Sequence, residues 1–221
     1  MRAPAANRAE NSRQTRDALL RAAVRVVSRH GFAGASVQRI TQACGVAQGS
    51  LYTYFGSHRE LLEELLPHEG ILLLRALGRS VDHEAGHFEN ERRTFEALFD
   101  YLRRKPYFLR LLTEAEIAAP LGFHQHARNI EDRYLRALQR GRDAGEVRPL
   151  HDAAYRVIAG VLSSSRGYIG IGLCSQDAKR LFHPPPIESW VSAAYVRFVR
   201  HGLGCPSGAI PVPAPLSALP C

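Results

Sequence analysis

The stretch SVQRITQACGVAQGSLYTYF, residues 36–55, decides the fold because it contains two short helical patterns around one glycine. Ser36 precedes the first pattern and can cap a helix with its hydroxyl group. Apolar side chains then recur at helical spacing, which places Val37, Ile40 and Ala43 on one face of the helix. Gly45 ends this pattern, since a residue without a side chain takes the positive φ of a sharp turn readily.

The second helical pattern runs from Gln48 to Tyr54 and carries polar and aromatic groups on its outer face. Leu51 and Phe55 are expected to be buried beneath it. The outward set is Gln48, Ser50, Tyr52 and Thr53. A short helix, a glycine-containing turn and a second helix with a polar outer face form a helix-turn-helix, whose second helix lies in the major groove of DNA.

The stretch from about Thr15 to Leu65 resembles the DNA-binding domain of the TetR (tetracycline repressor) family of bacterial transcriptional regulators. The residues that carry this resemblance are Arg29 to Phe32, Ser36 and Val37, Ile40, Ala43 to Val46, Gly49 to Phe55, and Ser57 to Leu62. None is diagnostic alone, but the ordered set is specific. The resemblance implies an all-α fold, with an N-terminal three-helix DNA-binding domain and a larger helical domain that binds a small molecule and pairs with a second subunit.

The resemblance also implies which residues contact DNA: Ser36, Gln38, Gln48, Gly49, Ser50, Tyr52, Thr53 and His58. Gln48 and Ser50 are expected to approach base edges, while Tyr52 gives its hydroxyl to a phosphate. The chain departs from the family pattern at Ala47, where the family often has a Ser or Thr whose hydroxyl caps the recognition helix. Gln48 is a candidate to supply the missing cap. It also departs at His58, where a lysine is frequent. A histidine is mostly uncharged at neutral pH, so a weaker phosphate contact is expected there.

The net charge of +8 is concentrated at the N-terminal end of the chain. Up to Leu62 there are nine arginines, no lysine and three acidic residues, so six of the eight excess positive charges lie there. Attraction to DNA phosphates requires such a distribution. A generally basic, arginine-rich proteome is the alternative explanation, and the adjacent helix-turn-helix favours DNA.

The 221 residues suffice for one large or two small domains. Uncharged apolar runs are shorter than the roughly 18 residues that span a bilayer. Residues 1–17 lack the apolar core of a secretory signal, so a cytoplasmic protein is expected. The four cysteines are expected to be reduced thiols because they form no zinc-finger spacing, with a redox pair of Cys174 and Cys205 as the alternative. They are Cys44, Cys174, Cys205 and Cys221.

Four segments are expected: a flexible arm over 1–12, the helix-turn-helix domain over 13–56, the effector-binding and dimerisation domain over 57–202, and a disordered proline-rich tail over 203–221. The first helix is predicted over Arg13 to His30, with Leu20, Ala23 and Val27 inward. A capping box of Ser57 and Glu60 starts the fourth, which Pro67 is expected to kink or break. Further helices are predicted at Glu89 to Arg104, Pro106 to Ala118, Gly122 to Gly141, Asp152 to Leu173 and Pro186 to His201, and no strands.

The last two predicted helices carry apolar residues on more than one face, which suits burial against both their own core and a second subunit. The candidate interface residues are Val157, Val161, Trp190, Ala194 and Phe198. Ordinary core helices of a monomer are the alternative. A homodimer is favoured because one recognition helix reads few base pairs and a two-fold axis doubles the site.

An effector pocket is expected to include Tyr107, Leu111, Glu114, Phe123, Tyr134 and Tyr168. An aromatic residue at helical spacing is also typical of plain core, so this set is a hypothesis. Glu114 lies in an apolar stretch and must find a donor there. Its donor is either a ligand or an arginine, Arg110 or one from the next helix.

No Ser-His-Asp grouping, glycine-rich phosphate loop or nucleophile elbow is present, so neither an enzyme nor a cofactor is expected. His83 and His87 are four residues apart, but Gly86 between them weakens the helical spacing, and no metal site is expected.

Three functions therefore compete. The first is a dimeric repressor released from a palindromic DNA operator by a small-molecule effector. The second is a helix-turn-helix DNA-binding protein with no inducer, architectural or division-linked. The third is a helical enzyme or metal-binding protein, which the missing catalytic grouping disfavours.

Overall fold

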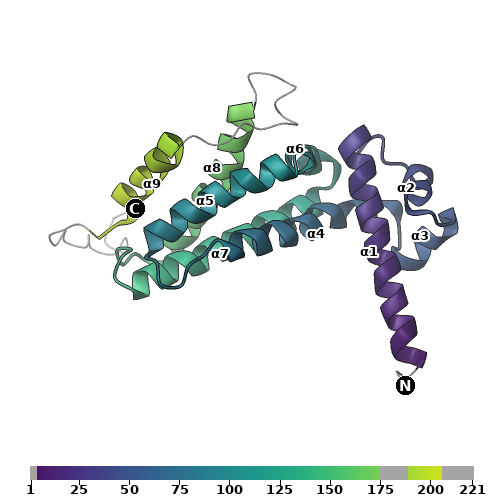
Figure 1. Cartoon of the computed structure of the whole chain (residues 1–221), viewed down its shortest axis with the longest axis horizontal. Helices are drawn as coiled ribbons and strands as arrows, with labels where there is room; N and C mark the ends of the chain where they lie inside the picture. Colours follow the sequence, from purple (N-terminus) through teal and green to yellow (C-terminus); the bar gives the residue numbers. More distant parts are fainter. Residues whose placement is uncertain (1–3, 175–188, 206–221) are drawn as a thin grey trace, which may run out of the picture.

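The computed structural model describes the backbone of residues 4–174 and 189–205, and the side chains of residues 10–166 and 189–205. These residues are all-α, as predicted, and they lack named strands (Figure 1). The helices are α1 (Pro4–His30), α2 (Val37–Cys44), α3 (Gln48–Tyr54), α4 (His58–Arg79), α5 (His87–Arg104), α6 (Tyr107–Ala118), α7 (Pro120–Asp143), α8 (Asp152–Cys174) and α9 (Ser189–Leu203).

Helices α1 to α3 form one end of the molecule, and α4 leads from them into a bundle with α5, α6 and α7 (Figure 1). The Ser36 hydroxyl caps α2 by accepting the Arg39 N–H at 3.3 Å. Gly45 ends α2 in the left-handed region with φ 77°, as the turn requires. Ala47 gives α3 no side-chain cap, and within the described residues no hydrogen bond of the Gln48 side chain replaces it.

The hydrophobic core begins in α1 and continues without a gap into the bundle. Leu20, Ala23 and Val27 are buried as predicted, in a cluster that also takes in α4 and α6. A second cluster joins α5 and α7 to α8 and α9. Helices α1 to α3 and the start of the larger domain therefore share one core.

Of the kink and the break expected at Pro67, the break is absent, because α4 continues through this residue. Proline has no N–H, so the carbonyl of Glu63, four residues earlier, lacks its helical donor. The α carbon of Gly122 on α7 packs against this carbonyl so closely that a Cβ would collide with it. The Gly122 N–H also donates to the Glu63 carboxylate at 2.7 Å. Packing of α7 at this point supports the continuous helix.

The other helices beyond residue 80 begin and end within three residues of their predicted bounds. Helix α1 differs most, because it begins at Pro4 where a flexible arm was expected. Proline suits the first turn of a helix, and the following alanines favour helix strongly. At the other end, Leu203 accepts the Arg148 N–H at 2.9 Å and Cys205 donates to Glu146 at 3.2 Å. The expected tail beyond residue 205 lies outside the described residues.

Candidate DNA-binding surface and effector cavity

Helix α3 has one buried and one exposed face, as its sequence predicts. Leu51 and Phe55 are fully buried. Gln48, Gly49 and Thr53 are exposed, and Ser50 is half-buried. Tyr52 is 56% exposed, which is unusual for so large a side chain in a folded domain. The polar face of α3 therefore stands free to contact another molecule.

Arg16 of α1 fixes the position of α3 relative to α4. Its guanidinium lies 4.6 Å from the centre of the Phe55 ring and bonds both carboxylate oxygens of Glu64 at 2.5 and 2.6 Å. The cation over the aromatic ring and the ion pair, in which Nη2 contacts both carboxylate oxygens, link α1 to the end of α3 and to α4.

The remaining residues expected to contact DNA lie around α2 and the start of α4. Gln38 is exposed, whereas the Ser36 hydroxyl is used in capping α2. His58 is half-buried, and its Nε2 lies 2.6 Å from the carbonyl oxygen of Ala35. This nitrogen is engaged within the protein, so it ties the start of α4 to the connection before α2.

A shallow basic hollow lies between α1 and α2, which sequence reasoning did not single out. It is lined by Arg25, Arg29, His30 and Arg39 among others. Arg25 donates to the carbonyl of Ala43 at 2.8 Å. The available signal was the spacing of Arg25 and Arg29, which places them on one face of α1.

Helix α6 contacts the DNA-binding end through an arginine and a glutamate. Glu114 accepts the Phe32 N–H at 2.8 Å and the Arg110 Nε–H at 2.6 Å. Arg110 also donates to the Ser28 carbonyl at 3.2 Å. Gly31 has φ 71°, and a Cβ there would lie 2.8 Å from Glu114 Oε2, so only glycine fits this turn. Of the two donors considered for Glu114, the structure gives Arg110, together with a backbone N–H.

A cavity of about 290 Å³ lies in the larger domain and is lined by residues of α4 to α8 and of the connections between them. One half is apolar, with Leu102, Phe108 and Ile130 in its wall. The other half is polar and contains arginine, histidine and acidic side chains, among them Arg133 and Glu91. A largely apolar cavity with a few polar groups at one end is typical of a site for a small organic molecule.

The floor of the polar half is a buried ion pair between helices α5 and α8. Glu91 and Arg166 are 6% and 5% exposed, and their side chains are 2.5 Å apart. The Tyr195 hydroxyl donates to the same Glu91 oxygen at 2.7 Å, and the Tyr134 hydroxyl at 3.2 Å. Burial raises the pKa of Glu91, but Arg166 and Tyr195 outweigh it and hold that pKa below its ordinary value. The carboxylate is therefore ionised, and its Oε1 accepts from Arg166 and from both tyrosine hydroxyls.

Two histidines line the cavity, the buried His126 and the half-buried His87. Burial lowers the pKa of His126 to about 4, which keeps its imidazole neutral, and its Nδ1 is buried without a hydrogen-bond partner among the described residues. Burial also lowers the pKa of His87, although Glu91 and Glu146 act against this shift, and its Nε2 is likewise unpartnered in the described part of the chain.

Comparison with known proteins agrees with this geometry. The profile of the family described as "Bacterial regulatory proteins, tetR family" matches residues 19–65. The HTH-type transcriptional repressor NicS of Pseudomonas putida is 31% identical over 146 residues, which is 66% of this chain and 66% of that protein's length. The chain belongs to the TetR family. It is a TetR-family transcriptional regulator.

Solved structures of TetR-family regulators share its fold. One from Pectobacterium atrosepticum has a TM-score of 0.65 at 20% identity and covers 88% of this chain and 96% of its own. Another, from Marinobacter aquaeolei, has a TM-score of 0.64 at 20% identity and covers 90% and 98%. Because the aligned regions cover most of each chain, the shared fold includes both the helix-turn-helix end and the helical bundle.

Most of the residues expected in the effector pocket of this TetR-family regulator lie elsewhere. Among the five whose side chains are described, Tyr134 lines the cavity. Tyr107 donates to the buried Glu69 at 2.7 Å, whereas Leu111 and Phe123 pack in the first core cluster. Glu114 binds Arg110 and Phe32, as above. The side chain of Tyr168 lies outside the described residues.

Arg133, Glu91 and Arg166, which the sequence did not single out, line the cavity instead. Arg166 could have been recognised from the sequence, because a lone arginine in a run of small and apolar residues indicates a buried charge with a partner.

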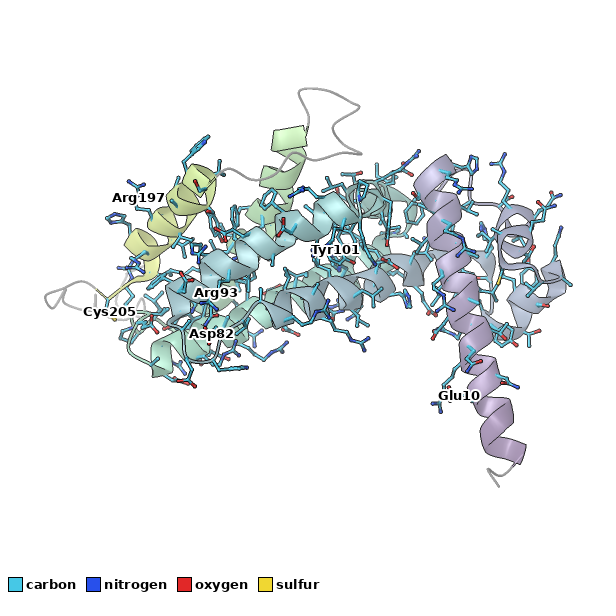
Figure 2. The ribbon with its side chains drawn as sticks, in the orientation of Figure 1. Glu10, Asp82, Arg93, Tyr101, Arg197 and Cys205 are labelled. Carbon is cyan, nitrogen blue, oxygen red and sulfur yellow. The ribbon has the colours of Figure 1, made fainter. Side chains whose placement is uncertain are left out.

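The five candidate interface residues of the TetR-family regulator are exposed on α8 and α9. Val157, Val161, Trp190 and Phe198 are 67%, 60%, 66% and 74% exposed, and Ala194 is exposed as well. In Figure 2, α9 lies on the outside of the bundle and its Arg197 points away from the other helices.

The residues weighed for metal or redox chemistry are dispersed. Over the described side chains, no three potential metal ligands form a group. Cys44 and Cys205 are free thiols, while the side chain of Cys174 and all of Cys221 lie outside the described residues. None of the helices in the described ranges has the length and hydropathy that crossing a bilayer requires.

Proposed function

We propose that this TetR-family regulator is a dimeric repressor that reads a palindromic operator with α3 and leaves it when a small molecule occupies the cavity. The observation that carries the proposal is the exposed face of α3, where Gln48, Tyr52 and Thr53 stand over the buried Leu51. Side chains so placed reach base edges and phosphates when the helix enters the major groove. The arginines of the basic hollow add phosphate contacts beside it.

Repression is supported by the relative named a transcriptional repressor. A bound dimer covers the DNA that polymerase needs, and its removal restores transcription. The architectural alternative involves no effector, so it assigns no ligand to the cavity of about 290 Å³.

Dimerisation is supported by the apolar face of α8 and α9. Val157, Val161, Trp190 and Phe198 are large apolar side chains that are each at least 60% exposed, and exposed apolar residues that cluster often mark an interface. A second copy related by a two-fold axis buries the same residues on both sides. The two α3 helices then reach successive turns of the DNA, about 34–36 Å apart.

Helix α6 supplies a route from the cavity to the DNA-binding end. One face of α6 lines the cavity with Phe108, Leu109 and Leu112. Another face carries Arg110 and Glu114, which bind α1 and the residues after it. A ligand that presses on the first face shifts the second. The ligand can lower operator affinity only as far as it binds the DNA-incompatible arrangement of the protein more tightly than the DNA-competent one.

The experiment is a genome-wide map of the sites that the full-length chain occupies in cells. The proposal predicts a small number of sites that share an inverted repeat upstream of genes, whose transcripts rise when the regulator is deleted. Broad occupancy without a shared motif supports the architectural alternative instead. Transcripts that fall on deletion overturn repression.

A further inference from the structure

We propose that the cavity takes a small organic monoanion, a carboxylate with an apolar body, and that Arg133 on α7 binds the carboxylate. This inference rests on the proposed function, because it names the class of effector. It is carried by an unpaired cation, by the satisfied state of the acids around it, and by the apolar half of the cavity.

Arg133 is half-buried in the cavity wall and has no hydrogen-bond or ion-pair partner among the described residues. Its Nη1 lies 3.9 Å from where a Cβ of Gly78 would stand, so the side chain spans from α7 to α4. Burial and the nearby cations Arg166, Arg140 and Arg136 all lower its pKa. An arginine stays protonated regardless. It is therefore a partly desolvated charge that a bound anion would stabilise.

The acidic side chains in the cavity wall are engaged with other partners. Glu91 is bonded by Arg166 and two tyrosine hydroxyls. Asp82 pairs with Arg93 at 2.9 Å, and the two side chains meet at the edge of the bundle in Figure 2. Glu146 accepts the His87 backbone N–H with both oxygens at 2.9 Å. None of these carboxylates bonds Arg133, so the positive charge there is available to a ligand.

The apolar half of the cavity fixes where the rest of the ligand lies. Ile130 is three residues before Arg133 on α7, so the two share a face of the helix. Beyond Ile130 the wall is formed by Leu102 of α5 and by Phe108 and Leu112 of α6. A ligand anchored at Arg133 therefore extends its apolar body toward α6, the helix that contacts the DNA-binding end.

The volume of the cavity limits the ligand to a small one. About 290 Å³ is at the lower end of ligand sites, which range from roughly 300 to 1,000 Å³. Of the arginines in the lining, Arg166 pairs with Glu91 and Arg140 is exposed to solvent, whereas Arg133 is half-buried. We therefore expect the ligand to place one negative charge at Arg133. A medium-chain or aromatic acid fits these limits, whereas a nucleotide or a polyphosphate does not.

The test is calorimetric titration of the full-length protein with matched acids and neutral analogues. The probes are octanoate against octan-1-ol and phenylacetate against 2-phenylethanol, with octylamine as the opposite charge. At least one acid is expected to bind about tenfold or more tighter than its alcohol, as a charge-assisted hydrogen bond provides, and octylamine more weakly than either. Equal affinities for acid and alcohol, tighter binding of octylamine, or no binding of either acid overturns the inference.

Two variants on α7 locate the contact. Arg133→Gln is expected to abolish the preference for acid over alcohol without lowering the melting temperature, because the removed charge has no partner. Arg136→Gln, an exposed arginine on the same helix, serves as the control and is expected to keep the preference. An unchanged preference in Arg133→Gln, or an equal loss in both variants, contradicts the role of Arg133.

Operator binding without ligand separates this inference from the function on which it rests. If the wild-type protein binds its palindrome and only a neutral or cationic probe releases it, the result supports the proposed function and contradicts the anion site. If it binds no palindrome, the proposed function fails whatever the probes do.

Discussion

At the scale of single residues, Gln48 and Tyr52 share the exposed face of α3 but are expected to act on different parts of DNA. Replacing Gln48 with alanine removes a side chain that can bond a base edge. We expect a loss of about 1–3 kcal/mol in operator binding and a relaxed preference at particular base pairs. Affinity measurements over single-base operator variants check both.

Tyr52→Phe removes only a hydroxyl, which is expected to donate to a phosphate. Binding should weaken by a similar factor on operator and on unrelated duplex, because a phosphate contact carries no base identity. Fluorescence anisotropy on the two duplexes measures this. Sequence-blind losses of equal size from both substitutions contradict the division of roles on α3.

Glu114 accepts two hydrogen bonds at the contact between α6 and the DNA-binding end. Glu114→Gln removes its charge and is expected to lower the free energy of unfolding by about 1–3 kcal/mol. Binding of a cavity ligand should stay unchanged, since Glu114 does not line the cavity. Urea denaturation and calorimetry measure the two, with the exposed Glu116→Gln as control. If Glu114→Gln changes the affinity for the ligand without changing stability, Glu114 contacts the ligand and its structural role is contradicted.

His126 makes stability depend on pH. Its folded pKa is about 4, below an unfolded value of about 6.5. Between these values the unfolded chain binds more protons, so this contribution is full above pH 6.5 and declines as pH falls toward 4. His126→Leu should flatten the dependence of unfolding free energy on pH in that window. Some dependence on pH should persist in this variant, because the pKa of His87 is also lowered. The control is His124→Leu at an exposed position, which should leave the pH dependence as in the wild-type protein.

At the scale of elements, the sequence predicts best where one short segment contains all the necessary information. Ser36 caps α2, Gly45 turns the chain, and α3 has its predicted bounds, because caps, turns and periodicity are local. Helix α6 shows the limit. It is buried on two faces, one against α1 and one on the cavity, and periodicity does not say which partner covers which face. Glu114 was assigned to the cavity for that reason.

The pair of Glu91 and Arg166 shows the same limit at longer range. The residues are 75 positions apart on different helices, and only the tertiary packing of the bundle, in which α7 contacts both α5 and α8, brings them together. A lone arginine in an apolar run indicates a buried partner but does not identify it. The cavity, which is lined by residues of five helices, depends on the same packing.

Arg166→Met is expected to cost about 3–5 kcal/mol, because it leaves the Glu91 charge buried and unpaired. The double variant with Glu91→Leu should recover much of this loss, since no charge is then buried. Because the folded pKa of Glu91 is depressed, wild-type stability from the pair is present above the ordinary carboxyl pKa and is lost as pH falls through the folded value. Denaturation of the three proteins measures this. A double variant no more stable than Arg166→Met disagrees with a pairing role.

At the scale of the whole molecule, the exposed face of α8 and α9 is proposed to be the dimer interface. Val161→Glu places a charge in that face and should yield a monomer that binds operator weakly. Ile117→Glu is the matched control, because Ile117 is 90% exposed on α6, away from the interface. Sedimentation gives the mass of each. A dimeric Val161→Glu protein rules out this face.

In the function that we propose, two copies of the chain read one palindrome through their two α3 helices. The most direct measurement titrates full-length protein onto the operator and onto a copy with one half-site scrambled, recording stoichiometry and affinity over a range of salt. We predict two chains per operator, a large loss of affinity on the half-scrambled duplex, and a steep fall of affinity with salt as counterions are released. One chain per duplex, or equal affinity for the two duplexes, would contradict it.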